Sequence, residues 1–185
     1  MEIITTPLKD LLVIRPKVFG DERGWFYESF QKRNYEKLAL KLEFVQDNRS
    51  YSTKGTLRGL HFQRPPYTQA KLVSCNSGKV FDLVVDLRTS SPTYQKAFGI
   101  ILDDENKLQL FVPKGFAHGF YVMSESAEFF YKCDDYYHPE AEGGVHYLSE
   151  QVKNLWPEQV LDKNSIKISQ KDLNLPHLSE HSCVF

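Results

Sequence analysis

The chain consists of short apolar or alternating runs separated by Gly, Pro, Asn and Ser, and this pattern constrains its fold more than any other feature. Runs of this length are typical of strands rather than helices. They recur about every dozen residues, which is the rhythm of a β-sandwich or barrel. The expected strands are Leu12–Ile14, Trp25–Phe30, Phe44–Asn48, Leu72–Cys75, Lys79–Leu87, Phe98–Leu102, Leu108–Pro113, Gly119–Met123 and Glu128–Cys133.

Only Tyr35–Leu42 shows a helical pattern, with Asn34 as its expected N-cap. Because strands and helices do not alternate as in a parallel sheet, we predict an all-β fold, a jelly-roll barrel of two sheets. The polar segment Asp162–Phe185, interrupted by Pro176, is expected to pack over the barrel. We expect a single domain over residues 1–185, with this tail beginning at about residue 158.

The composition argues against several classes of protein. With 23 basic and 24 acidic residues, the net charge of −1 does not suit a protein that coats nucleic acid or an anionic membrane. No apolar run approaches the roughly 20 residues of a membrane span, and we expect no secretory signal. Cys75, Cys133 and Cys183 fit neither a zinc site nor a disulfide framework, so we expect a reduced, cytoplasmic protein.

Two motifs in the first half of the chain carry residues suited to chemistry. If Leu57–Phe62 is a strand, Arg58 and His61 point to opposite faces unless a bulge at Gly59 interrupts the alternation. Lys71 follows one hairpin later and can present an ammonium beside the imidazole. Alternatively, the histidine is incidental on a surface strand and the lysine stem lies along apolar surface.

Three further motifs have both a chemical and a structural interpretation. A Pro-Gly turn leads His118 into an apolar strand, and Tyr131 lies in a strongly aromatic run. An interior tyrosine mostly packs and donates one hydrogen bond. Arg23 stands beside aromatic residues in Asp21–Glu28, as an anionic aromatic ligand requires, although an ordinary charged turn has the same composition.

A catalytic metal is not expected. Metal-binding barrels of this kind use a His-x-His pair, a following Glu and a distal His. His118 matches the distal His, but His61 is followed by Phe62 and Gln63, and no Glu occurs between Phe62 and Ser77. Two imidazoles are too few ligands for a zinc- or iron-type ion. The chain also lacks a Gly-x-Ser-x-Gly motif, a P-loop and a Rossmann fingerprint.

Together the motifs resemble the dTDP-4-dehydrorhamnose 3,5-epimerase family from about Leu8 to Pro157. The resemblance implies a cupin-type jelly roll, no cofactor, and a homodimer with exchanged N-terminal strands. It also implies a nucleoside-diphospho-4-keto-6-deoxy sugar as substrate, epimerised at carbons 3 and 5. The matching stretches are Asp21–Gly24, Gln46–Asn48, Arg58–Gln63, Lys71–Val73, Phe81–Asp82, Val85–Arg88, Ser91–Thr93, Pro113–Phe120, Tyr131–Lys132 and Tyr136–Tyr137.

The resemblance further implies roles for individual residues. His61 is expected to be the base and Tyr131 the acid on the opposite face of the sugar. Lys71 is expected to stabilise the enolate oxygen at carbon 4, and Asp82 to hold the catalytic charges. Arg23, Arg58 and Lys171 match contacts to the nucleotide and its diphosphate, and Tyr137 matches an aromatic that stacks on thymine. Further ligand-contacting positions are matched by Phe26, Glu28, Gln46, Asn48, His118 and Glu142.

One stretch departs from the family pattern. Many members pair the His base with an Asp in an Ile-Asp-Trp-Pro stretch, but the corresponding run here is Asn154-Leu155-Trp156-Pro157. Tyr147-Leu148-Ser149 likewise replaces a Trp-Asn-Asp pattern. We therefore expect His61 to lack this carboxylate, which normally fixes the imidazole tautomer. Three alternatives follow: His61 is a weaker base, it uses another acceptor, or it acts on fewer carbons. The alternatives are an epimerase for a single carbon of a related nucleotide sugar, a non-catalytic sugar-nucleotide binder, or a metal-dependent isomerase or dioxygenase.

Overall fold

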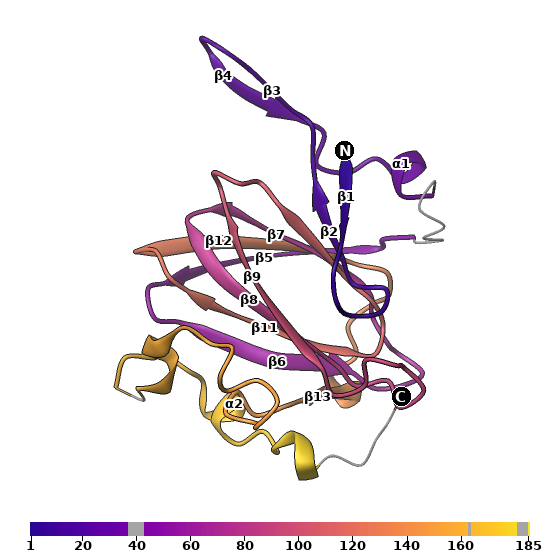
Figure 1. The fold of residues 1–185 in the computed structure, drawn as a ribbon, viewed down its shortest axis with the longest axis vertical. Coiled ribbons are helices and arrows are strands. Elements are labelled where there is room, and N and C mark those ends of the chain that lie inside the picture. Colours follow the sequence, from indigo (N-terminus) through magenta and orange to yellow (C-terminus); the bar gives the residue numbers. More distant parts are fainter. Residues whose placement is uncertain (37–42, 163, 181–184) are drawn as a thin grey trace.

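The computed structural model describes residues 1–36, 43–162, 164–180 and 185. Its main body consists of two antiparallel sheets that face each other (Figure 1). This confirms the predicted all-β jelly roll. The six-stranded sheet runs β1 (Glu2–Thr5), β2 (Leu12–Arg15), β10 (Gln109–Val112), β7 (Lys71–Ser77), β12 (Ser126–Cys133), β5 (Gln46–Thr53). The five-stranded sheet runs β13 (Glu142–Gly144), β6 (Leu57–Gln63), β11 (Phe116–Val122), β8 (Lys79–Asp86), β9 (Ala97–Asp103).

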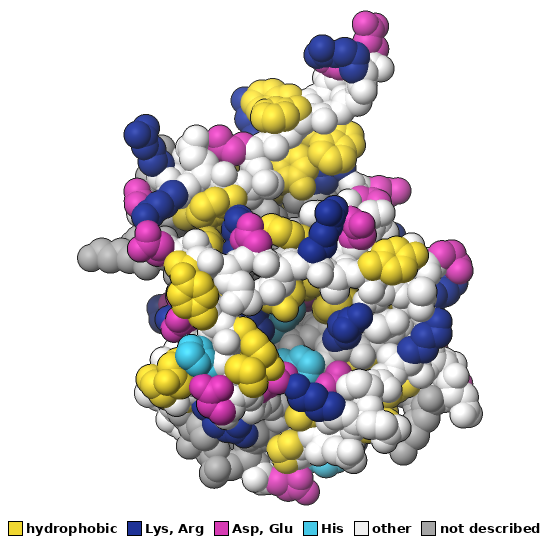
Figure 2. Space-filling view, turned by 180° about the vertical axis from the view of Figure 1, so that it is seen from behind, with side chains coloured by type: hydrophobic (Ala, Val, Ile, Leu, Met, Phe, Trp, Pro, Cys, Tyr) yellow, Lys and Arg dark blue, Asp and Glu magenta, His cyan; other side chains and the backbone are white. Residues whose placement is uncertain are grey.

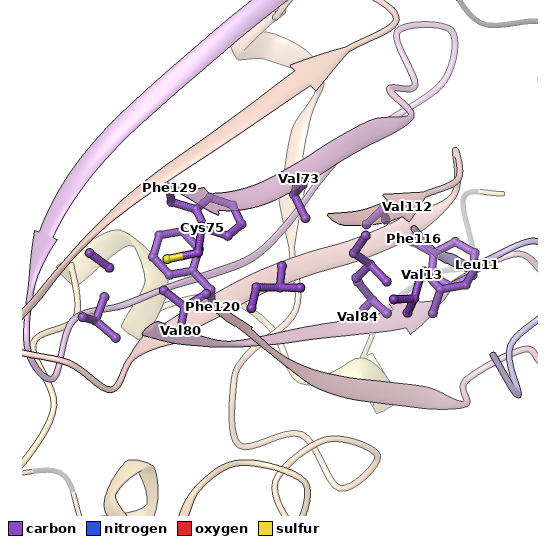
Figure 3. Close-up of a cluster of buried hydrophobic side chains, with 14 of the residues drawn as sticks. Leu11, Val13, Val73, Cys75, Val80, Val84, Val112, Phe116, Phe120 and Phe129 are labelled. Carbon is purple, nitrogen blue, oxygen red and sulfur yellow. The ribbon is translucent and has the colours of Figure 1, made fainter. Parts of the chain in front are cut away.

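The space between the sheets is filled by apolar side chains. Successive residues of a strand point to opposite faces, so Phe129 of β12 is buried at 1% exposure while Phe130 lies on the outer face. Phe129 stacks on Phe120 of β11 across the core, with ring centroids 4.3 Å apart. Figure 3 shows this cluster, which extends from Cys75 and Val80 to Leu11. The sheets are thus held at a fixed separation at this level of the sandwich.

The C-terminal segment covers the outer face of the five-stranded sheet. Tyr147, Trp156 and Val160 pack there against Leu83 and Val85 of β8. The segment continues through the short helix α2 (Gln170–Leu173), which lies beside β6 (Figure 1). It therefore lies over the sandwich as predicted, and it brings charged residues to the strand that carries His61.

A two-stranded hairpin projects from the sandwich. It consists of β3 (Val18–Asp21) and β4 (Gly24–Tyr27), and Figure 1 shows it extending away from both sheets. Its side chains are unusually exposed for their type: Trp25 is 60% exposed and Phe26 is 68% exposed. A protruding apolar hairpin is typical of a surface that another chain covers.

Several boundaries differ from those predicted. The strand expected at Trp25–Phe30 ends at Tyr27, and β5 continues from Gln46 to Thr53 because its inward side chains alternate beyond the apolar run. The strands β1, β3 and β13 were not predicted, since they are short or carry few apolar residues. The helix α1 (Lys32–Glu36) begins before Asn34, so the N-cap prediction was wrong. The rest of the expected helix, 37–42, lies outside the described residues.

Strand β6 is kinked at Gly59. His118 of β11 pairs with His61, and Phe120 pairs with Arg58. The chain therefore advances three residues on β6 for two on β11, which is a β-bulge with one extra residue in β6. Gly59 has a φ of 107°, and a Cβ there would lie 2.7 Å from the carbonyl oxygen of His118. Only glycine adopts this conformation in so close an approach. The bulge turns Arg58 and His61 toward the same cavity, which is the alternative that the sequence had left open.

Replacement of Gly59 by alanine should destabilise the protein and disorder the cavity. The added methyl group meets backbone on β11, which cannot move away cheaply, so we expect a loss of about 3 kcal/mol in unfolding free energy. Urea denaturation measures this loss. Gly20→Ala is the control, because the nearest atom to its Cβ is 3.6 Å away. Equal stability of the two variants would contradict the assigned role of the bulge.

Candidate active site

The candidate site is a cavity of about 470 Å³ that opens between the two sheets. Its wall includes His61, Lys71, His118 and Tyr131, together with Asp172 from the C-terminal segment. Figure 2 shows histidine side chains in this hollow, with lysine and arginine side chains around its rim. The structure therefore brings together the residues that the motifs had singled out from distant parts of the chain.

His61 is bonded to a buried carboxylate. Its Nε2 lies 2.7 Å from Oδ1 of Asp172, whose side chain is only 6% exposed. The backbone N–H of Gly59 donates to the other carboxylate oxygen at 3.3 Å. Burial alone would raise the pKa of Asp172, but the hydrogen bonds from His61 and Gly59 outweigh it and the pKa lies below its ordinary value.

The tautomer of His61 follows from this pairing. An ionised Asp172 only accepts hydrogen bonds, so Nε2 of a neutral His61 carries the proton and Nδ1 is left as a proton acceptor. No described residue forms a hydrogen bond with Nδ1. The side chain is 30% exposed and lines the cavity, so a ligand can reach it.

Of the alternatives left open for His61, the structure shows the use of another acceptor. Leu155 is 41% exposed and is not part of the cavity wall, so the Asn154–Pro157 run has no bearing on the base. The partner is supplied 17 residues further along, by Asp172 in α2, as the hydrogen bond shows. The signal available in the sequence was Ser169, which caps the helix that contains Asp172.

Tyr131 and Lys71 face His61 from the opposite sheet. Tyr131 lies on β12 and Lys71 on the neighbouring β7, whereas His61 lies on β6 of the five-stranded sheet. The prediction that Lys71 is one hairpin from His61 was therefore wrong, because the two strands belong to different sheets. The ammonium of Lys71 lies 5.7 Å from the centre of the Tyr131 ring.

Burial shifts both of these groups. It raises the pKa of Tyr131 above its ordinary value, so the phenol keeps its proton near neutral pH. It lowers the pKa of Lys71, although nearby Cys133, Glu142 and Asp82 partly oppose this effect. The charged form of Lys71 is consequently lost at a lower pH than that of an exposed lysine. The cavity thus places a neutral proton donor and a desolvated cation opposite the imidazole.

Asp82 contacts a different histidine from the base. Its Oδ2 lies 2.8 Å from Nε2 of His118, and both side chains are buried. Its other oxygen has no protein partner among the described residues. Asp82 therefore lies behind His118 and does not itself line the cavity. It orients His118 and adds negative charge near Lys71.

A second recess of about 300 Å³ adjoins the cavity and shares Asn48, His61, Lys71 and Tyr131 with it. Amide side chains from Gln46 and Asn48 line its wall, and Gln46 also accepts the backbone N–H of Tyr137. Two lobes that meet at the same four residues suit a ligand that extends on both sides of a reacting centre.

Glu142 joins the two lobes at their rim. Its Oε2 accepts from the hydroxyl of Tyr137 at 2.6 Å and from the ammonium of Lys171 at 2.5 Å. The hydrogen bond to Glu142 raises the pKa of Tyr137 to about 12. Arg58 lies nearby on the cavity wall, where its Nε donates to Ser52. These predicted ligand-contacting residues are therefore brought together.

Three predicted site residues are not brought to this cavity. Arg23, Phe26 and Glu28 lie on or next to the projecting hairpin, and none of them lines the cavity that contains His61. Arg23 instead forms an ion pair with Asp21, and Glu28 accepts hydrogen bonds from Gln31 and Asn34. Within one chain, these residues cannot act on a ligand that His61 contacts.

The motif around Asp86 has a structural role. Its buried carboxylate accepts hydrogen bonds from Arg88, Ser91 and Thr93, which lower its pKa despite burial. Arg88 also reaches Asp10, so the network fastens the loop after β1 to the end of β8. These residues support the fold rather than the cavity.

The described residues contain no group of three His, Cys, Asp or Glu side chains placed to hold a metal ion. Nor does any helix in the described part of the chain have the length and apolar character needed to span a membrane.

The geometry defines a class of protein. A carboxylate-supported imidazole on one sheet and a neutral phenol on the other can remove a proton from one face of a bound molecule and return one to the other face. A cation beside the phenol stabilises the intermediate anion. These are the groups that an isomerase needs in order to invert the configuration of a carbon next to a carbonyl.

Comparison with known proteins identifies the family. The family model for dTDP-4-dehydrorhamnose 3,5-epimerase matches residues 5–180. The protein of that name from Shigella flexneri is 50% identical over 175 residues, which cover 94% of both chains. The chain belongs to the dTDP-4-dehydrorhamnose 3,5-epimerase family and is an isomerase. The match extends beyond Pro157, where the resemblance was expected to end, and includes Asp172.

Solved structures agree with this assignment. The dTDP-6-deoxy-D-glucose-3,5-epimerase from Legionella pneumophila Philadelphia 1, in complex with dTDP-4-keto-L-rhamnose, is 50% identical, with a TM-score of 0.91 and coverage of 98% of this chain and 94% of that chain. ChmJ, a 3'-monoepimerase from Streptomyces bikiniensis, solved with dTDP-quinovose, is 27% identical, with a TM-score of 0.85 and coverage of 94% and 86%. The cupin-like fold is therefore shared with both.

Replacement of Asp172 by asparagine should reduce turnover by about 100-fold. The amide cannot hold the protonated Nε2 of His61 as an ionised carboxylate does, while the side chain keeps its volume. Steady-state kinetics should show the loss in kcat with little change in KM, and circular dichroism should show an intact fold. Asp162→Asn is the matched control, since Asp162 lies in the same tail and its carboxylate accepts hydrogen bonds there from Asn164 and Ser165. Full activity of the Asp172 variant would show that the pairing is dispensable.

Proposed function

We propose that this chain converts dTDP-4-dehydro-6-deoxy-D-glucose to dTDP-4-dehydro-L-rhamnose by inverting carbons 3 and 5, within dTDP-rhamnose biosynthesis. The observation that carries the proposal is the placement of His61 and Tyr131 on opposite sheets of one cavity. Inversion requires a proton to leave one face of the sugar and another to arrive on the other face. Two groups on the same strand cannot serve both faces.

In the first step, Nδ1 of His61 takes the proton from carbon 3 or carbon 5. The ketone at carbon 4 makes these hydrogens acidic, since the electron pair of the broken C–H bond moves onto the carbonyl oxygen. Asp172 holds the resulting imidazolium through Nε2. Lys71 faces the enolate oxygen as a cation, a type of contact that is worth roughly 3 kcal/mol in comparable sites.

In the second step, the hydroxyl of Tyr131 gives its proton to the same carbon from the other face. The pKa of Tyr131 is raised, so the donor is protonated at the start of each cycle. The phenolate regains a proton, and the imidazolium loses one, by exchange with solvent through the cavity mouth. The net reaction is inversion at one carbon, and a second cycle inverts the other. Asp82 supports this machinery through His118.

The nucleotide portion of the substrate is assigned to the cavity rim. Arg58 and Lys171 are placed for the diphosphate, for which guanidinium and ammonium groups are suitable donors. Tyr137 is 48% exposed beside Glu142, where its ring face is accessible to the thymine. Gln46, Asn48 and Glu142 contact the ligand from the second recess.

A homodimer completes the site. Arg23, Phe26 and Glu28 lie on or beside a hairpin that projects away from the chain's own cavity, with its aromatic side chains exposed. Exchange of this hairpin between two copies covers the aromatic surface and adds Arg23 to the partner's diphosphate site. This arrangement accounts for ligand-binding residues on an element that lies outside the cavity in one chain.

An epimerase for a single carbon is the second candidate. ChmJ, which has this activity by its description, shares the fold at 27% identity. The relative described as a 3,5-epimerase is 50% identical. The presence of Asp172 removes the observation that had favoured a restricted activity, so we favour inversion at both carbons. We place the enzyme in the cytoplasm, consistent with the buried free thiols of Cys75 and Cys133.

Proton NMR of the enzyme with dTDP-4-dehydro-6-deoxy-D-glucose in deuterated water tests the reaction. We expect the signals at both carbon 3 and carbon 5 to disappear, because each removed proton is replaced by deuterium. His61→Ala should abolish both losses, and Tyr131→Phe should abolish inversion, with the fold intact in each variant. Loss of one signal only would establish a single-carbon epimerase, and loss of neither would refute the proposed reaction.

A mixing experiment tests hairpin exchange. Light scattering should give about twice the 21.5 kDa of one chain. Arg23→Gln and His61→Ala should each be poorly active alone, but mixing them should raise activity above the sum, since one site of the mixed dimer has all its groups. Arg15→Gln replaces an exposed ion-paired arginine outside the hairpin and should keep full activity. A monomer, or no gain on mixing, would rule out a shared site.

A further inference from the structure

The basic side chains on the cavity wall differ in how their charge is balanced. Arg49 forms an ion pair with Glu128 at 2.8 Å, and Lys171 forms one with Glu142 at 2.5 Å. An anion that binds to either of these must compete with a carboxylate already in place. Their contribution to binding a negatively charged group is reduced accordingly.

Arg58 and Lys167 line the same cavity without an ion pair to any described carboxylate. Arg58 donates to the hydroxyl of Ser52 at 3.1 Å, and the ammonium of Lys167 donates to the hydroxyl of Thr53 at 2.9 Å. Hydroxyl groups orient these cations without neutralising them. The charge of Lys167 acts on Glu125, and that carboxylate is itself paired with Lys54.

The backbone holds Lys167 beside the strand that carries Arg58. The N–H of Lys167 donates to the carbonyl of Gly55 at 2.7 Å, and its carbonyl accepts from Leu57 at 2.9 Å. Lys167 is also bridged to Thr56 in parallel register. Gly55 permits this approach, since a Cβ there would lie 2.8 Å from the carbonyl oxygen of Ser165. The segment is thus fixed next to the start of β6.

We infer that Lys167 is a further substrate-binding residue, which joins Arg58 in holding the diphosphate of the nucleotide sugar. A diphosphate diester carries two negative charges near neutral pH. Neither Arg58 nor Lys167 has to break an ion pair with a described carboxylate when the diphosphate binds. Lys167 reaches this group from the tail, whereas Arg58 reaches it from β6. The inference rests on the proposed function, because it takes the diphosphate as part of the ligand.

Titration calorimetry with dTDP and with thymidine tests the role of Lys167. Lys167→Gln should weaken dTDP binding about five- to tenfold, as expected for the loss of one charge-assisted contact, with thymidine affinity unchanged. The variant should keep its kcat within about twofold, since the residue takes no part in proton transfer in the proposed mechanism. Lys167→Arg should restore most of the dTDP affinity.

The matched control is Lys54→Gln. Lys54 lies on the β5–β6 turn to which the Lys167 backbone is bonded, and it has the same charge, but it is paired with Glu125 and does not line the cavity. If Lys54→Gln weakens dTDP binding as much as Lys167→Gln, the effect is one of overall charge and the inference is wrong. Unchanged dTDP affinity in Lys167→Gln, or equal weakening for thymidine, would also overturn it.

The calorimetric result is separate from the fate of the proposed reaction. A wild-type protein that binds dTDP but shows no deuterium exchange would refute the reaction, while the calorimetric comparison would still support or overturn the role of Lys167. A wild-type protein that does not bind dTDP would overturn both.

Discussion

The bulge at Gly59 positions the principal groups of the active site. In a regular strand, Arg58 and His61 would point to opposite faces, and only one of them would reach the cavity. The extra residue in β6 puts both on the cavity wall and turns the Gly59 N–H toward Asp172. One backbone irregularity thereby sets the position of the base, of its carboxylate partner and of an anion-binding arginine.

The sandwich architecture supplies the second requirement, which is chemistry on two faces of one carbon. Tyr131 and Lys71 belong to the six-stranded sheet, and His61 and His118 belong to the five-stranded sheet. The core around Phe120 and Phe129 keeps the sheets apart at a fixed distance. Enclosure between them also raises the pKa of Tyr131 and lowers that of Lys71, so the same packing that stabilises the fold prepares the acid and the cation.

The C-terminal segment completes the electrostatics of the site. It contributes Asp172 to the base, Lys171 to the bridge with Glu142, and Lys167 to the cavity wall. Its sequence is polar and lacks strand periodicity, so hydrophobic patterning carried no information about where it lies. This explains why a partner for His61 was sought near Leu155, within the better-matched part of the chain, and was not found there.

The class of fold and most of the reactive groups could be predicted from the amino-acid sequence. Alternating apolar runs specify strands, and the His61, Lys71 and Tyr131 motifs are local enough to be read directly. The sequence left open whether Gly59 carries a bulge, and it misplaced Lys71 and missed Asp172. These three points follow from the folded chain, because each depends on contacts between segments far apart in the sequence: β6 against β11, one sheet against the other, and α2 against β6. Such contacts arise from packing and have no local pattern of their own.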